Sequence, residues 1–272
     1  LKAALLPLNA WLRGTYGAAS GPVAALFAIM TKVGVYAIIR VYSLIFGPDA
    51  DAVSGLLQPW LAPLALATLL GGAMLALAAQ TLRALAGGLV IGSVGLLLFG
   101  FGVATPVALA ALLYYLPHTT LVMAALYLLA DQLNLRRPAG DSLRGGGVKD
   151  ARLALLFVVA AILAAGLPPS AGFLAKLWLL QGLPYAAPGW WIGAVLLAAL
   201  LSMIALARAG SALFWQAAVE PLKPVPVGSG MPIAILLALA VVAALGAAPL
   251  AGFCQRTAGQ LLQAANYTEL IR

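Results

Sequence analysis

The sequence predicts an all-α membrane protein, a polytopic bundle of transmembrane helices in one domain over residues 1–272. Apolar residues make up 64% of the chain and charged residues only 8%, against about 25% in typical soluble domains. The mean hydropathy is +1.07. Long apolar runs follow one another, and a span of the bilayer core needs about 20 such residues. These observations exclude a water-soluble globule, a disordered tail and a collagen-like fibre.

Seven segments are apolar and long enough to be full spans. They are predicted at 21–46, 61–80, 85–103, 105–132, 153–182, 189–216 and 231–253, and a partial span at 1–8 precedes them. The uncharged stretch that begins at Ala84 is too long for one helix, so we divide it at the Gly-rich, Pro-containing stretch from Gly100 to Pro106. The apolar and polar residues do not alternate as β-barrel strands require.

The start of the chain and its composition further restrict the class of protein. The sequence begins at Leu1 without an initiator Met or a signal peptide, so we expect the C-terminal half of a longer protein or a truncated gene product. The net charge is +8, but the basic residues are spread thinly between apolar runs, which disfavours nucleic-acid binding. A single cysteine, Cys254, allows no internal disulfide and no cysteine-based metal cluster. We expect neither a cofactor nor a metal.

The distribution of basic residues predicts the orientation. When the predicted spans alternate in direction, one face of the membrane receives Arg13, Arg83, Arg136, Arg137, Arg144, Lys149, Arg152 and Lys223. The opposite face receives Asp49, Asp51 and a tail with Arg256 and Arg272. The positive-inside rule makes the first face cytoplasmic. We therefore expect a cytoplasmic loop at 134–151 and an extracytoplasmic tail at 254–272. Two GxxxG pairs, Gly17–Gly21 and Gly88–Gly92, predict close helix packing.

Four ionisable residues lie within the apolar segments: Lys2, Lys32, His118 and Lys176. A charge at the bilayer centre costs about 2.5–3.5 kcal/mol on insertion scales. Unlike arginine, lysine and histidine can release a proton, and burial lowers the pKa of a lysine. The set therefore predicts proton transfer rather than anion binding. Two alternatives stay open: one lysine alone could snorkel or pair with an acid, and His118 could be a hydrogen-bonded core residue.

Prolines predict breaks beside two of these lysines. Gly166, Pro168 and Pro169 fall in the middle of the 153–182 span, ahead of Lys176, and Pro7 follows Lys2. Proline removes a backbone donor and interrupts a helix. Broken helices at membrane depth line polar cavities and mark ion sites in transporters. The alternative for Pro168-Pro169 is a simple kink.

These motifs resemble the D subunit of Mrp-type multisubunit cation/proton antiporters. The resemblance rests on Leu1–Leu8, on Pro22–Gly34 around Lys32, on His118-Thr119-Thr120, on Gly166–Lys176 and on Ala207–Ser211. The motif around Lys176 is also similar to the proton-pumping subunits of respiratory complex I. The family usually has a histidine where this chain has Asn9 and a proline where it has Arg13.

The resemblance implies a function and a location. It implies the C-terminal half of a fourteen-helix subunit in a bacterial plasma membrane, within a hetero-oligomeric complex that exchanges Na⁺ or K⁺ for H⁺. It assigns proton transfer to Lys2, Lys32, His118 and Lys176, and the protein would be a transporter subunit rather than an enzyme. Two alternatives remain: a membrane subunit of a complex I-like proton pump, which the Gly14-Thr15-Tyr16 segment disfavours, and a non-functional fragment.

Overall fold

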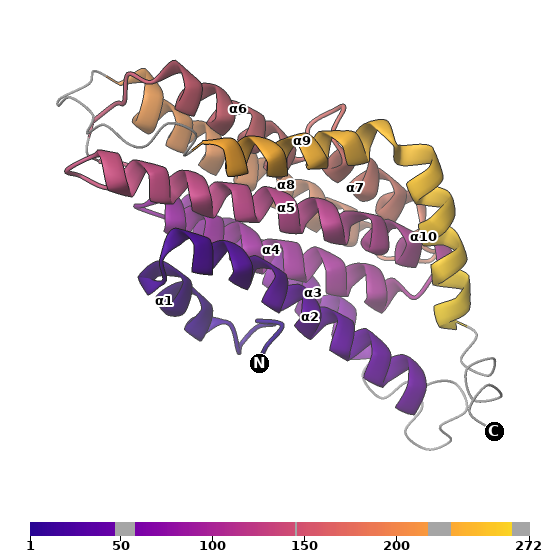
Figure 1. The fold of residues 1–272 in the computed structure, drawn as a ribbon. Coiled ribbons are helices and arrows are strands. Elements are labelled where there is room, and N and C mark those ends of the chain that lie inside the picture. Colours follow the sequence, from indigo (N-terminus) through magenta and orange to yellow (C-terminus); the bar gives the residue numbers. More distant parts are fainter. Residues whose placement is uncertain (47–57, 145, 217–229, 263–272) are drawn as a thin grey trace.

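The chain forms a bundle of helices in the computed structural model, which describes residues 1–46, 58–144, 146–216 and 230–262 (Figure 1). Asp49, Asp51, Lys223, Arg272 and the side chain of Arg13 lie outside the described part. The helices are α1 (Ala10–Ala18), α2 (Gly21–Ile45), α3 (Gln58–Leu77), α4 (Leu82–Val103), α5 (Pro106–Arg136), α6 (Ala151–Ala165), α7 (Ala171–Gln181), α8 (Gly189–Gly210) with a π-helical turn at Ser211–Trp215, α9 (Met231–Leu245) and α10 (Ala247–Leu262). Within these ranges no strand forms, and the all-α prediction is confirmed.

The spans agree with the prediction in the middle of the chain and differ at its ends. Five helices (α2, α3, α4, α5 and α8) are long and apolar enough to cross a membrane, and the bent pair α9–α10 adds a sixth if it is one span. The 153–182 segment divides into α6 and α7, as its prolines predict.

Two predicted boundaries are wrong. Residues 1–8 form turns rather than a partial helix, since Ala4 has a φ of +55° and Pro7 lacks an N–H. The predicted span at 231–253 stops at Leu245, and the chain then bends by 79° into α10. Pro249 lies in the first turn of α10, where no backbone donor is needed. In Figure 1, α10 therefore crosses one end of the bundle.

Helix α4 lies at the centre of the bundle, and 94% of the residues in its most apolar 18-residue stretch are buried. It approaches α3 closely along a row of glycines. A Cβ on Gly88 would lie 2.5 Å from the backbone nitrogen of Ala76, and one on Gly92 would lie 3.5 Å from the carbonyl oxygen of Leu69. The Gly88–Gly92 pair thus packs two helices together, as predicted. Gly17 of the other pair faces open space instead.

An ion pair clamps the turn between α1 and α2. Arg83 Nη2 lies 2.7 Å from Asp131 Oδ1, and the same oxygen accepts a hydrogen bond of 3.1 Å from Gly21 N at the start of α2. Arg83 also donates to the carbonyl of Ala19 over 2.7 Å. The carboxylate meets the positive end of α2, and the guanidinium meets carbonyls at the end of α1. Both charges complement the helix dipoles.

The predicted loop at 134–151 is shorter than expected and is bound to its neighbours, because α5 continues to Arg136. Leu82 N donates to Asp141 O, Leu143 N to Gln80 O and Val148 N to Leu213 O. Arg136 and Asp150 form an ion pair of 2.6 Å. Burial lowers the pKa of Arg137, and Asp141 opposes that shift. This loop joins the α3–α4 turn to the end of α8, so the basic residues of these segments gather at one end of the bundle.

Candidate functional site

Lys32 lies in the interior of the bundle, halfway along α2. Its side chain is 2% exposed, and its amine donates a hydrogen bond of 2.9 Å to Ser93 Oγ on α4. The Ser93 hydroxyl donates in turn to Val90 O over 2.7 Å. Neither ion pair within the described ranges includes Lys32. The polar partner of this buried amine is therefore a hydroxyl rather than a carboxylate.

A second polar centre forms at the break between α6 and α7. Helix α6 ends at Ala165, Gly166 turns the chain with a φ of +71°, and Ser170 caps α7 by accepting from Phe173 N over 3.1 Å. Pro168 and Pro169 lie between the two helices. The last carbonyls of α6 have no following helical turn to bond with, so they are available to other donors.

Two of the predicted residues use these carbonyls. Lys176 donates to the carbonyl of Ala165 over 2.7 Å, and His118 Nε2 lies 3.1 Å from the carbonyl oxygen of Leu163. A Cβ on Gly166 would lie 2.8 Å from Lys176 Nζ. The missing side chain at the break therefore makes room for the amine. The C-terminus of a helix carries partial negative charge, so this end of α6 favours a cationic side chain.

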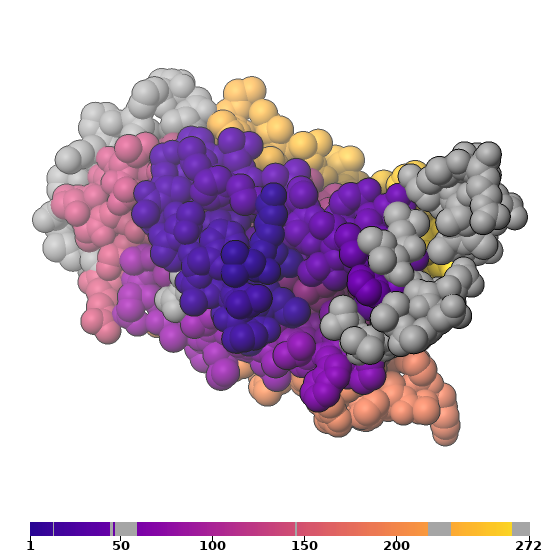
Figure 2. Space-filling model, turned by 90° about the horizontal axis from the view of Figure 1, so that it is seen from below, coloured from indigo at the N-terminus to yellow at the C-terminus, as the bar shows by residue number. Residues whose placement is uncertain are grey.

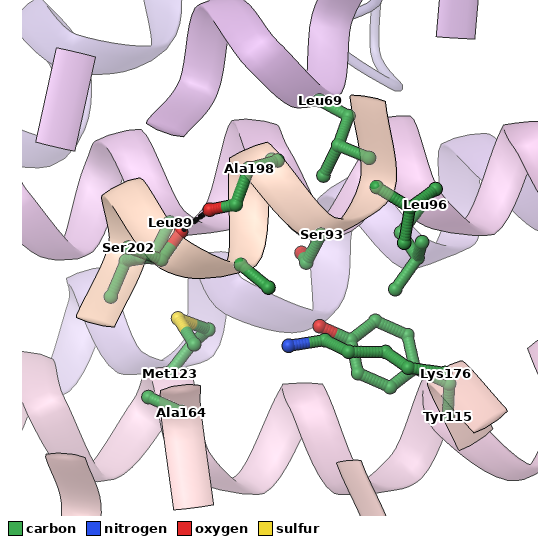
Figure 3. Close-up of a pocket in the computed structure, with 13 residues that line it drawn as sticks. Leu69, Leu89, Ser93, Leu96, Tyr115, Met123, Ala164, Lys176, Ala198 and Ser202 are labelled. Atoms are coloured by element: carbon green, nitrogen blue, oxygen red, sulfur yellow. Dashed lines mark hydrogen bonds between the residues drawn. The ribbon is translucent and has the colours of Figure 1, made fainter. Parts of the chain in front are cut away.

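A cavity of about 30 Å³ lies between α3, α4, α5, α8 and the α6–α7 break. Most of its wall is apolar, and four polar side chains interrupt it: Ser93, Tyr115, Lys176 and Ser202. Figure 3 shows the Lys176 amine and the Tyr115 hydroxyl pointing into the space below Ser93 in that view. The cavity thus touches Lys176 directly and Lys32 through its partner Ser93.

The four predicted proton-transfer residues are not all brought together. Lys176 lines the cavity, Lys32 is connected to it through Ser93, and His118 lies with Lys176 at the end of α6. The Lys2 side chain is exposed, although its backbone packs against Gly34, near the middle of α2. Figure 2 shows these N-terminal residues on the outer surface of the bundle. Pro7 lies in the same exposed turns.

Sequence reasoning missed the hydroxyl groups of the cavity. Ser93 is the only polar residue of the predicted 85–103 span, so a signal for it existed. Ser202 and Tyr115 carry a weaker signal, because the predicted 189–216 span also contains Arg208, Ser211 and Gln216, and the 105–132 span contains several other polar residues.

Comparison with known proteins identifies a family whose members are similar to this chain. The family described as NADH:quinone oxidoreductase/Mrp antiporter, TM matches residues 1–202. The probable D subunit of a K⁺/H⁺ antiporter from Rhizobium meliloti is 34% identical, with 100% of this chain and 56% of the relative aligned. The D subunit of an Na⁺/H⁺ antiporter from Bacillus subtilis is also 34% identical, with 100% and 55% aligned. The chain spans about half the length of these curated relatives.

Solved structures share the fold. A chain of the Mrp complex from a Dietzia species superimposes with a TM-score of 0.88 at 22% identity, covering 98% of this chain and 58% of the other. A chain of respiratory complex I from Thermus thermophilus superimposes with a TM-score of 0.80 at 27% identity, covering 96% and 56%. The likeness to the Mrp chain at this identity establishes the fold alone.

Proposed function

Because the chain belongs to the NADH:quinone oxidoreductase/Mrp antiporter transmembrane family, we propose that it forms part of the proton path of a cation/proton antiporter. The antiporter exchanges cytoplasmic Na⁺ or K⁺ for external protons, since both cations occur in the names of the relatives. The chain is a transporter subunit of a bacterial plasma membrane, and it works with the other subunits of a hetero-oligomeric complex.

One observation carries the proposal: Lys176 lines the cavity, and Lys32 is hydrogen-bonded to Ser93, which lines the same cavity. Neither lysine belongs to an ion pair within the described residues. An ammonium group that is stabilised only by a hydroxyl or a carbonyl gives up its proton more readily than one held by a carboxylate. Lys32 and Lys176 are therefore the proton-transfer groups, and His118 assists at the end of α6. We assign Lys2 to the same path at the bundle surface.

The basic residues support an orientation. Arg83, Arg136, Arg137, Arg144, Lys149 and Arg152 lie around the bound loop and the α3–α4 turn. By the positive-inside rule this end faces the cytoplasm. The 134–151 loop is then cytoplasmic and the 254–272 tail extracytoplasmic.

The test is transport in everted vesicles. The complete antiporter that contains this chain is produced in cells lacking their own antiporters, and dissipation of ΔpH is followed after addition of Na⁺ or K⁺. Lys32→Ala and Lys176→Ala should each abolish cation-dependent dissipation, because each removes a titratable group. Lys149→Ala removes an exposed loop cation and should leave transport unchanged. Full activity in both lysine variants would refute the proton path.

Complex I also contains chains with this fold, so a redox-driven pump is the second candidate. Copurification of the chain with a flavin- and iron–sulfur-containing assembly, without cation-dependent ΔpH dissipation, would favour the pump. The greater identity to the antiporter subunits favours the antiporter.

A further inference from the structure

Ser93 is the polar link between Lys32 and the cavity. Within the described part of the chain, the Lys32 amine donates to Ser93 Oγ at 2.9 Å. The Ser93 side chain is 3% exposed and also lines the cavity. A hydroxyl has one donor and two acceptor sites. Since Ser93 donates to Val90 O and accepts from Lys32, one acceptor site remains for a group in the cavity.

The cavity has the size and the polarity to hold water. Its volume is about 30 Å³, and one water needs roughly 10–15 Å³ and two to four polar partners. About two waters therefore fit. Ser93, Tyr115, Lys176 and Ser202 supply polar groups from four different helices. Water in this space completes a hydrogen-bonded chain from Lys32 through Ser93 to Lys176.

His118 lies beside this connection and not within it. Its Nε2 is occupied by the carbonyl of Leu163, its Nδ1 is buried without a hydrogen-bond partner among the described residues, and it does not line the cavity. A proton that moves between the two lysines through the cavity passes Ser93 and does not need the imidazole.

We propose that Ser93 is a proton-transfer residue that relays protons between Lys32 and the water of this cavity. The proposal rests on the proposed function. The Ser93 hydroxyl first rotates from Val90 O toward a cavity water. An N–H bond of the Lys32 ammonium then breaks as an O–H bond forms on Ser93, and the original hydroxyl proton passes to that water. That water protonates the neutral amine of Lys176, and rotation of the Ser93 hydroxyl restores the start. The net result is the transfer of one proton from Lys32 to Lys176, with no electron transfer.

The experiment compares variants of Ser93 in the vesicle assay with the complete antiporter. Ser93→Ala should lower turnover by an order of magnitude or more, as loss of a positioned proton-transfer group does, and should raise the H₂O/D₂O rate ratio because proton transfer becomes limiting. Ser43→Ala is the matched control. It removes a serine hydroxyl that bonds to Arg40 O of its own helix and that does not line the cavity, so it should retain turnover and isotope ratio.

A pair of variants with side chains of equal size separates loss of the hydroxyl from loss of assembly of the complex. Ser93→Thr keeps the hydroxyl and Ser93→Val does not, although the two side chains have the same shape. Turnover in the threonine variant with loss in the valine variant supports the relay. Equal turnover in both refutes it. If Lys32→Ala and Lys176→Ala lose activity while Ser93→Val keeps it, only this inference fails. If the lysine variants also keep activity, the proposed function fails.

Discussion

The clamp between Arg83 and Asp131 should contribute measurably to stability, because it joins α1, α2, α4 and α5. The two side chains are only 12% and 20% exposed. Asp131→Asn removes the charge and weakens a charge-assisted hydrogen bond, which is worth about 1.5–3 kcal/mol. Asp131→Ala also removes the acceptor of Gly21 N at the start of α2, a cap worth about 1 kcal/mol. We expect losses of about 2 and about 3 kcal/mol.

The clamp also bears on the proposed site. Lys32 follows Gly21 on the same helix at about 16 Å along its axis, given a rise of 1.5 Å per residue. A shift of the α2 N-terminus therefore moves Lys32 relative to Ser93. We expect Asp131→Ala to lower transport as well as stability.

The assay is reversible unfolding of the chain in mixed micelles of dodecyl maltoside and SDS, followed by tryptophan fluorescence. Arg152→Ala is the control, because that side chain is exposed and forms neither of the ion pairs in the described residues. It should change the free energy of unfolding by less than about 0.5 kcal/mol. If both Asp131 variants also stay within that range, the clamp contributes nothing. If they lose equal amounts, the bond to Gly21 contributes nothing.

Two further pairs of variants are measured in the same unfolding assay. Gly88→Ala brings a Cβ to 2.5 Å from Ala76 N, whereas Gly193→Ala places one in open space. Both gain similar helix propensity, so the first should be less stable than the second by about 1–3 kcal/mol; equal stabilities would contradict the close α3–α4 contact. Gly166→Ala should cost about 1–2 kcal/mol at its positive φ and displace the Lys176 amine, which also lowers transport. Ala104→Gly, at a φ of +57°, should stabilise by about 1 kcal/mol. Destabilisation there would refute the backbone argument.

Hydrophobicity and proline placement made much of the fold predictable. The apolar runs located the central spans, and Pro168-Pro169 located the break between α6 and α7, because both effects act within a short segment. The hydropathy of Met231 to Phe253 does not indicate the break at Gly246, and the only signals for it in the sequence are Gly246 itself and Pro249. The N-terminal turns were not predicted either. Their geometry depends on packing against Gly34 of α2, which lies far along the chain.

The candidate site was predictable in part for the same reason. A lysine or histidine in an apolar run is costly wherever its neighbours are, so Lys2, Lys32, His118 and Lys176 could be selected without a structure. Their partners could not be selected. Lys32 bonds to a serine 61 positions away, and His118 bonds to a carbonyl 45 positions away. Every residue has a backbone carbonyl, so residue identity does not indicate which carbonyl accepts a side-chain hydrogen bond.

The sequence by itself determined the class of this protein, the lysines within its apolar segments and the break at Pro168-Pro169, because the cost of burying a charge and the lack of a backbone donor are properties of individual residues. Only the tertiary structure decided that Ser93 and Lys176 line one cavity, that His118 stands beside it, that the Lys2 side chain is exposed, and that Arg83 and Asp131 clamp α1 to α2. Those arrangements depend on which helices come into contact. The packing of α3 on the glycines of α4, together with the hydrogen bonds of the loop after α5, holds those helices in place.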